Sequence, residues 1–196
     1  TAGGGTADLR AAGVEVITDP GAAATAAAEH VNRAWLTAVR TGRPHVTLKS
    51  ASTLDGRAAA ADGSSRWITG PDARADVHAL RARSDAVLVG GGTLRADDPH
   101  LAVRGVEGAT QPLRVVADTR AEIEPTARVL DDAAPTLVAV AEGADTARLT
   151  DAGVDVLALP VGERGIAPAA LLAGPRPFAP QRPLPGLLRR LHARLP

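Results

Sequence analysis

Residues 86–93 read Ala-Val-Leu-Val-Gly-Gly-Gly-Thr, a short apolar run that ends in three glycines. Such a run, with its β-branched residues, predicts a buried strand, and the glycines allow a tight turn into a helix. Similar runs follow at 113–117, 136–140 and 154–159, and a helical pattern at 144–151 separates the last two. Strands that alternate with short helices are typical of an α/β sheet, which is the fold class that we predict.

The segment before this strand adds a helix and a further strand. A proline suited to a first helical turn, and the apolar spacing after it, predict a helix over 71–83. One face of that helix carries Arg74, His78 and Arg81, because these residues are spaced at i, i+4 and i+7. Residues 45–50 alternate apolar and polar side chains and predict a strand.

Lys49 is the single lysine among 22 basic residues. It lies on the predicted strand at 45–50, where Val46 and Leu48 are expected to face the core and Lys49 to point away. The residues alone leave two interpretations open, an exposed strand lysine and a functional one.

The two ends of the chain differ from its middle. Residues 14–17 predict a short strand and residues 20–40 an alanine-rich helix, which the turn at 41–44 ends. The segment 173–196 has six prolines, five arginines and no acidic residue, a composition that blocks helices and central strands. We therefore predict three parts, 1–42, 43–172 and 173–196.

Composition narrows the class of protein. The chain has 196 residues, 45% hydrophobic and 22% charged, as in an ordinary globular protein. Its formal net charge is zero and no apolar run has the length of a membrane span, so we expect neither nucleic acid nor membrane as a partner. It has no cysteine and no methionine. The first absence excludes a disulfide and a thiolate zinc site, and the second predicts a piece of a longer product.

Three motifs in residues 43–104 point to one family. They read Arg-Pro-His-Val-Thr-Leu-Lys, then Ser-Arg-Trp-Ile-Thr-Gly-Pro, then Ser-Asp-Ala-Val-Leu-Val-Gly-Gly-Gly-Thr-Leu-Arg-Ala-Asp-Asp-Pro-His-Leu. This closely resembles the start of the reductase domain in the bifunctional riboflavin-biosynthesis deaminase/reductase family. Residues 1–42 resemble the end of that family's deaminase domain, whose zinc site cannot be here because the chain lacks cysteine.

The resemblance implies a dihydrofolate-reductase-like mixed sheet with flanking helices. It also implies an NADPH-dependent oxidoreductase that reduces the ribosyl group of 5-amino-6-(5-phosphoribosylamino)uracil to ribityl by hydride transfer. The expected partners are this phosphorylated ribosylaminopyrimidine and a second copy of the chain, in the cytoplasm. Two alternatives stay open, a reductase of another heterocycle on the same fold and an inactive nucleotide-binding fragment.

The resemblance also implies the site residues, and it implies no metal. As catalytic residues it gives Lys49, whose ammonium could polarise a ring oxygen or imine, and Asp97. The substrate residues are Ser65, Thr69, Arg81, Leu101 and Arg104. The cofactor residues are Ala51, Trp67, Thr93, Asp97 and Thr119. Arginines suit a phosphorylated substrate, because a guanidinium binds phosphate through two hydrogen bonds.

Two residues allow a second interpretation. Trp67, one of two tryptophans, could instead be a core aromatic residue. Asp118 follows a predicted strand, where a Rossmann protein would place an acid that binds the ribose of NAD. The resemblance favours NADPH, with Thr119 as the contact.

The resemblance weakens toward the end of the chain. The family continues with a strand that ends in Glu-Gly-Gly-Pro or a similar sequence, whereas this chain becomes rich in proline and arginine from about Ala173. We interpret 173–196 as an aberrant or frame-shifted tail, and we expect the sheet to be incomplete at its C-terminal end.

Overall fold

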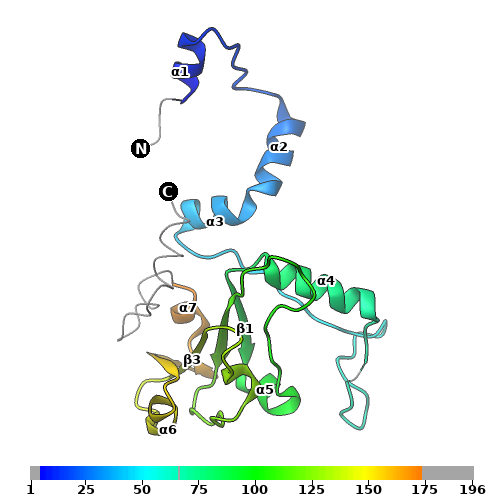
Figure 1. Cartoon of the computed structure of the whole chain (residues 1–196), viewed down its shortest axis with the longest axis vertical. Helices are drawn as coiled ribbons and strands as arrows, with labels where there is room; N and C mark the ends of the chain where they lie inside the picture. Colours follow the sequence, from blue (N-terminus) through cyan, green and yellow to red (C-terminus); the bar gives the residue numbers. More distant parts are fainter. Residues whose placement is uncertain (1–4, 66, 174–196) are drawn as a thin grey trace. The chain divides into compact units, whose positions relative to one another are not determined.

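A computed structural model describes residues 5–65 and 67–173 and divides the chain into two units between Val46 and Thr47. The first unit has three helices, α1 (Gly5–Ala11), α2 (Ala22–Val31) and α3 (Arg33–Thr41) (Figure 1). The predicted strand at 14–17 is wrong, because these residues form no regular structure. A strand needs a neighbouring strand to bond its N–H and C=O groups, and no described strand pairs with this segment.

The helix predicted at 20–40 is two helices that meet at Asn32. This residue has φ −94° and ψ 9°, and its side-chain amide donates a hydrogen bond of 2.9 Å to the Ala28 carbonyl oxygen. Asparagine competes in this way for backbone groups, which is why it is found at helix ends. The apolar spacing along 20–40 could not reveal the break.

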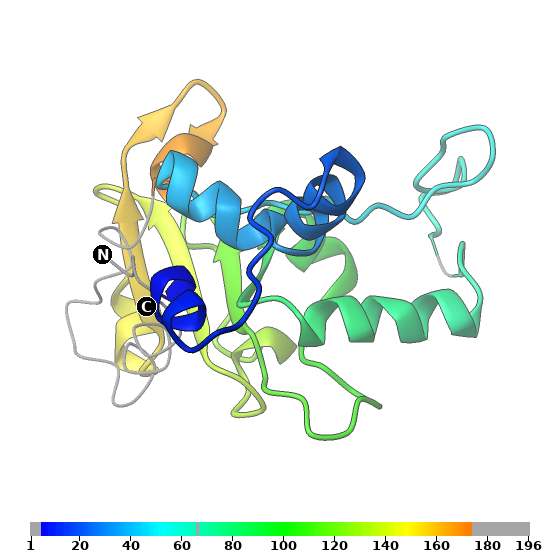
Figure 2. The same cartoon turned by 90° about the horizontal axis from the view of Figure 1, so that it is seen from above.

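The second unit is built on a four-stranded parallel sheet, β1 (Ala86–Gly90), β2 (Leu113–Ala117), β3 (Thr136–Ala141) and β4 (Asp155–Leu159). The strands lie side by side in chain order (Figure 2). The α/β fold class and the strands predicted from residue 86 onward are thus confirmed. Since the strands are parallel, their carboxyl ends meet at one edge of the sheet, where ligands bind in open α/β sheets.

Short helices and loops connect these strands. Helix α4 (Pro71–Ala82) confirms the prediction over 71–83, and α5 (Gly91–Asp97) follows β1 without an intervening turn, so that two of the three glycines lie inside the helix. The later elements are the 3-10 helix η1 (Arg128–Leu130), helix α6 (Ala147–Asp151), the antiparallel pair β5 (Val161–Gly162) and β6 (Gly165–Ile166), and helix α7 (Pro168–Leu171).

The core lies on both faces of the sheet. On one face, Val116 and Val138 pack with Leu94 of α5 and Leu149 of α6. On the other, a smaller cluster consists of Val115, Ala139, Leu159 and Leu171. Neighbours along β2 and β3 therefore belong to opposite faces, which explains why these strands read as unbroken apolar runs.

The predicted strand at 45–50 is wrong. Residues 44–53 form no regular structure, and Val46 and Leu48 are 62% and 89% exposed rather than buried. In the described sheet β1 and β4 are the edge strands, and neither pairs with this segment. The alternation of apolar and polar side chains is a local property of the sequence, but a strand forms only where a neighbouring strand provides hydrogen-bond partners for its backbone.

Arg114 joins β2 to two loops. Its side chain is fully buried, and Nη1 donates hydrogen bonds to Asp131 Oδ1 at 2.7 Å and to the His100 carbonyl at 3.3 Å. Nη2 donates to the carbonyl oxygens of Asp131 and Ala134. The bond to Arg114 is the main cause that lowers the pKa of Asp131 to about 2. A buried charge is tolerated only when it is paired in this way.

Two further observations complete the description. Within the described ranges, no helix combines the length and apolar character that crossing a membrane requires. The predicted tail 173–196 lies outside the described residues except for Ala173.

We predict that Arg114→Ala lowers the free energy of unfolding by about 3 kcal/mol, because it leaves buried carbonyl groups without a donor and opens a cavity. Urea unfolding followed by circular dichroism measures this change. Arg120→Ala is the control, since the Arg120 side chain is 72% exposed. It should change stability by less than about 0.5 kcal/mol. An equal effect of both substitutions would contradict the role given to Arg114.

Candidate functional site

The segment 98–104, which follows α5, has its backbone fixed at several points. Arg114 binds the His100 carbonyl, and the Gln111 side chain both accepts from the Val103 N–H at 2.7 Å and donates to its carbonyl at 3.0 Å. Leu101 is buried in the core with a positive φ of 62°. This conformation is unfavourable for a leucine and is kept only where the surroundings enforce it. The segment is therefore a rigid platform.

Leu101 was predicted to contact substrate. Its side chain is only 4% exposed and packs with Val116 and Leu94. Little of it could face a ligand, so a contact at this position would involve its backbone.

The platform brings Arg104 close to helix α4. The Arg104 N–H donates a hydrogen bond of 3.1 Å to His78 Nδ1. Burial first, and then the positive charge of Arg104, lower the pKa of the Arg81 guanidinium. Burial, followed by the charges of Arg81 and Arg104, likewise lowers the pKa of His78. The two predicted substrate arginines thus lie close enough to repel one another. Such a pair of cations suits a doubly charged anion.

Two further predicted residues, Trp67 and Thr69, lie just before the first turn of α4 and contact Arg74 of that helix. The Arg74 guanidinium carbon lies 4.4 Å from the centre of the Trp67 ring, and its Nη1 donates a 2.6 Å hydrogen bond to the Thr69 carbonyl. Trp67 is 72% exposed, so the alternative that it is a core residue is wrong. Arg74 and His78 had no predicted role, although the sequence placed both on the face of Arg81.

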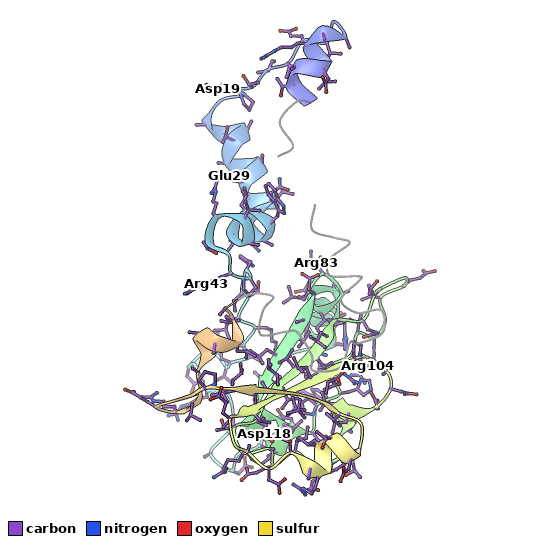
Figure 3. All side chains as sticks on the ribbon, turned by 90° about the vertical axis from the view of Figure 1, so that its left-hand side faces the viewer. Asp19, Glu29, Arg43, Arg83, Arg104 and Asp118 are labelled. Atoms are coloured by element: carbon purple, nitrogen blue, oxygen red, sulfur yellow. The ribbon has the colours of Figure 1, made fainter. Side chains whose placement is uncertain are left out.

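Asp118 and Thr119 follow β2 at the carboxyl edge of the sheet. The buried Asp118 carboxylate accepts a 2.7 Å hydrogen bond from the Ile123 N–H, and Arg95 Nη1 lies 3.8 Å from its other oxygen. These contacts tie Asp118 into its own turn, which argues against a Rossmann-type ribose contact. Asp118 also lies away from Arg104, in another part of the unit (Figure 3).

The Thr119 hydroxyl accepts a hydrogen bond of 3.3 Å from the Ile166 N–H. A Cβ atom on Gly165 would lie 2.5 Å from this hydroxyl oxygen, closer than real Cβ contacts. The hairpin of β5 and β6 therefore reaches Thr119 only because residue 165 is glycine. Thr93 is an exposed residue of α5, and Asp97 is the last residue of that helix.

Three predicted residues lie in or near the segment before α4. Lys49 is exposed, and Ala51 and Ser65 are half-buried, all three outside helices and strands. Their assignment to the reaction site stays a prediction. In the described parts of the chain, no three acidic or histidine side chains gather as metal ligands would.

Comparison with known proteins identifies the family. Residues 44–194 match the family described as the RibD C-terminal domain. The chain belongs to this family. Its match extends into the segment 173–196 that the sequence sets apart.

Several curated relatives carry the name riboflavin biosynthesis protein RibD, and two of them illustrate the similarity. The chain is 51% identical to the protein of Mycobacterium tuberculosis (strain H37Rv) over 140 residues, which are 70% of this chain and 40% of the relative. It is 43% identical to that of Bacillus amyloliquefaciens over 162 residues, 81% of this chain and 43% of the relative. The chain thus spans about two fifths of the length of these relatives.

Solved structures agree with this family. The RibD of Acinetobacter baumannii superposes with a TM-score of 0.65 and 39% identity, over 79% of this chain and 43% of that one. A deaminase/5-amino-6-(5-phosphoribosylamino)uracil reductase of Thermotoga maritima gives 0.63 and 35%, over 73% and 40%. The dihydrofolate-reductase-like fold class that the sequence predicts is thereby confirmed.

The carboxyl edge of the sheet and, separately, the Trp67 ring offer surfaces that a dinucleotide could use. Thr93 and Thr119 follow two neighbouring parallel strands, β1 and β2. A Cβ atom on Gly90 or Gly92 would meet nothing within 4 Å, so the backbone there is open to a close approach. The exposed ring of Trp67 offers a flat face for stacking.

We predict that Arg74 and Trp67 stabilise one another through the cation–π contact. A double-mutant cycle of Arg74→Leu and Trp67→Leu, measured by urea unfolding, should give a coupling energy of about 0.5–1 kcal/mol. The same cycle with Arg83→Leu in place of Arg74→Leu should give no coupling, because Arg83 lies past the other end of α4. Equal coupling in both cycles would count against the contact.

We predict that Gly165→Ala lowers the free energy of unfolding by about 1–3 kcal/mol. The new methyl group would press on Thr119, and the φ of 115° at this position is strained for alanine. Gly162→Ala is a matched control in the same hairpin, since its nearest neighbour, at 3.6 Å, is at ordinary contact distance. Urea unfolding should rank the two variants in this order, and the reverse order would refute the close approach.

Proposed function

We propose that this chain is a reductase of riboflavin biosynthesis that acts on a phosphorylated ribosylaminopyrimidine with NADPH. The observation that carries the proposal is the pair of arginines, Arg81 and Arg104, whose positive charges act on one another where α4 contacts the platform segment. Membership of the RibD C-terminal domain family, and the Thermotoga maritima relative described as a phosphoribosylaminouracil reductase, support the same activity.

In this proposal the two arginines hold the phosphate of the substrate. Each guanidinium can donate two parallel hydrogen bonds to phosphate oxygens, which fixes the distance from the phosphate to the sugar carbon that reacts. Thr69 and Ser65 would contact the rest of the substrate. Arg74 keeps the Thr69 carbonyl and the Trp67 ring in place.

The cofactor supplies a hydride when it is bound. Trp67, Ala51, Thr93 and Thr119 would line its position. The chemistry that the bound cofactor would support is reduction of the former anomeric carbon of the ribose, whose bond to the ring oxygen would break while that oxygen takes up a proton. Lys49 would stabilise the charge that develops on the oxygen, and Asp97 would contact both substrate and cofactor.

Two measurements test the proposal. NADPH fluorescence is titrated with the full chain, and saturable micromolar binding is expected. NADPH oxidation is then followed with the phosphorylated substrate and with the same compound after removal of its phosphate. Oxidation only with the phosphorylated compound supports the proposal. Oxidation with the dephosphorylated compound alone would favour a reductase of another heterocycle, and absence of NADPH binding would favour an inactive fragment.

We predict that Lys49→Ala lowers the rate of reduction by about 10²–10⁴-fold, because the developing negative charge loses its cation. NADPH affinity should change by less than about twofold, since the ammonium acts on the substrate. Arg57→Ala, at another exposed cation in the segment before α4, is the control and should keep the wild-type rate. Reduction that survives Lys49→Ala would overturn the assignment.

A further inference from the structure

His78 contacts Arg104 and is affected by the charges of both arginines, and the proposed function leaves it without a role. It is one helical turn before Arg81 on α4 and is half-buried. Its Nδ1 accepts the hydrogen bond from the Arg104 backbone N–H at 3.1 Å. This bond links α4, which carries one arginine, to the platform segment, which carries the other.

The hydrogen bond defines the protonation state of the imidazole. Because Nδ1 is the acceptor, the neutral ring carries its proton on Nε2. A protonated imidazole carries a hydrogen on both nitrogens and could not accept from the Arg104 N–H. Arg81 and Arg104 are the charged groups that act on His78, and both repel a third positive charge. Burial of the ring first, and then the charges of Arg81 and Arg104, therefore favour the neutral imidazole that accepts the Arg104 N–H.

We propose that His78 is a positioning residue for phosphate binding, whose neutral imidazole holds the Arg104 backbone so that the Arg104 guanidinium stands beside that of Arg81. This inference rests on the proposed function and deepens it, since it names a residue that sets the affinity for the phosphate group. His78 does not touch the phosphate and acts through the backbone of Arg104.

One consequence distinguishes this role from simple packing. A phosphate dianion bound by Arg81 and Arg104 cancels the repulsion that acts on His78. By linkage this change favours a higher pKa of His78, whereas loss of the hydrogen bond from the Arg104 N–H on protonation favours a lower one. In the positioning role the second effect prevails, so the ring stays neutral when phosphate is bound.

The test measures the binding of ribose 5-phosphate to the full chain by isothermal titration calorimetry. His78→Leu removes the acceptor, whereas His78→Asn keeps an oxygen on Cγ at the place of Nδ1. We expect His78→Leu to weaken binding about tenfold and His78→Asn to remain within about threefold of the wild type. His30→Leu, an exposed histidine in the first unit, is the control and should bind as the wild type does.

Two further measurements test the role of His78 even if the His78→Leu variant does not fold. His78→Gln carries the same amide one bond further along, so it should bind less tightly than His78→Asn. The His78 ring signals are also titrated with pH by NMR, with and without ribose 5-phosphate. We expect a midpoint with the ligand that is no higher than the midpoint without it, and a higher midpoint would overturn the proposal.

The outcomes separate this inference from the proposed function. Equal affinity of the His78→Asn and His78→Gln variants, or wild-type affinity of His78→Leu, refutes the role of His78 and leaves the reductase proposal intact. Tight binding of ribose 5-phosphate with the expected variant order, but no NADPH oxidation, supports His78 and refutes the reductase. Absence of ribose 5-phosphate binding by the wild type refutes the role of His78, whatever the enzyme assay gives.

Discussion

The buried guanidinium of Arg114 is the constraint on which the candidate site depends. A charge that is fully removed from water must be matched by acceptors, and here these are three backbone carbonyls and the Asp131 carboxylate. The acceptors belong to the segments around His100 and Asp131, so one side chain of β2 fixes two loops at once. His100 strengthens the arrangement, because its Nε2 pairs with Asp131 Oδ2 at 2.5 Å. The strand at the centre of the sheet thus determines the path of the platform segment.

The platform segment in turn contacts helix α4. Arg104 follows directly on the residues that Arg114 and Gln111 hold, and its N–H reaches His78 on the helix. The helix then presents three side chains on one face, because Arg74, His78 and Arg81 repeat at helical spacing. Arg74 contacts Trp67 and the Thr69 carbonyl, and the charge of Arg104 acts on Arg81. One helix face therefore connects the groups expected to bind cofactor with those expected to bind phosphate.

Local patterns predicted those elements whose neighbours lie close in the sequence. Helix α4 and the strands β1 to β4 agree with their apolar spacing, because a helix bonds within itself and each of these strands has its partner next along the chain. The strands expected at 14–17 and 45–50 did not form, since alternation of side chains supplies no partner for backbone hydrogen bonds. The break at Asn32 was missed because a side chain, and not the apolar period, causes it.

By itself the sequence determined the chemistry that is available: the α/β class, the motifs of the RibD family, two arginines suited to phosphate and a single lysine. Only the tertiary structure decided how these residues relate. It brought the Arg104 backbone to His78, buried Leu101, engaged Asp118 in its own turn and brought Gly165 against Thr119. The physical reason is that the residue type determines which partners a side chain can bind, whereas packing and the hydrogen bonds of buried polar groups determine which residues lie next to that side chain.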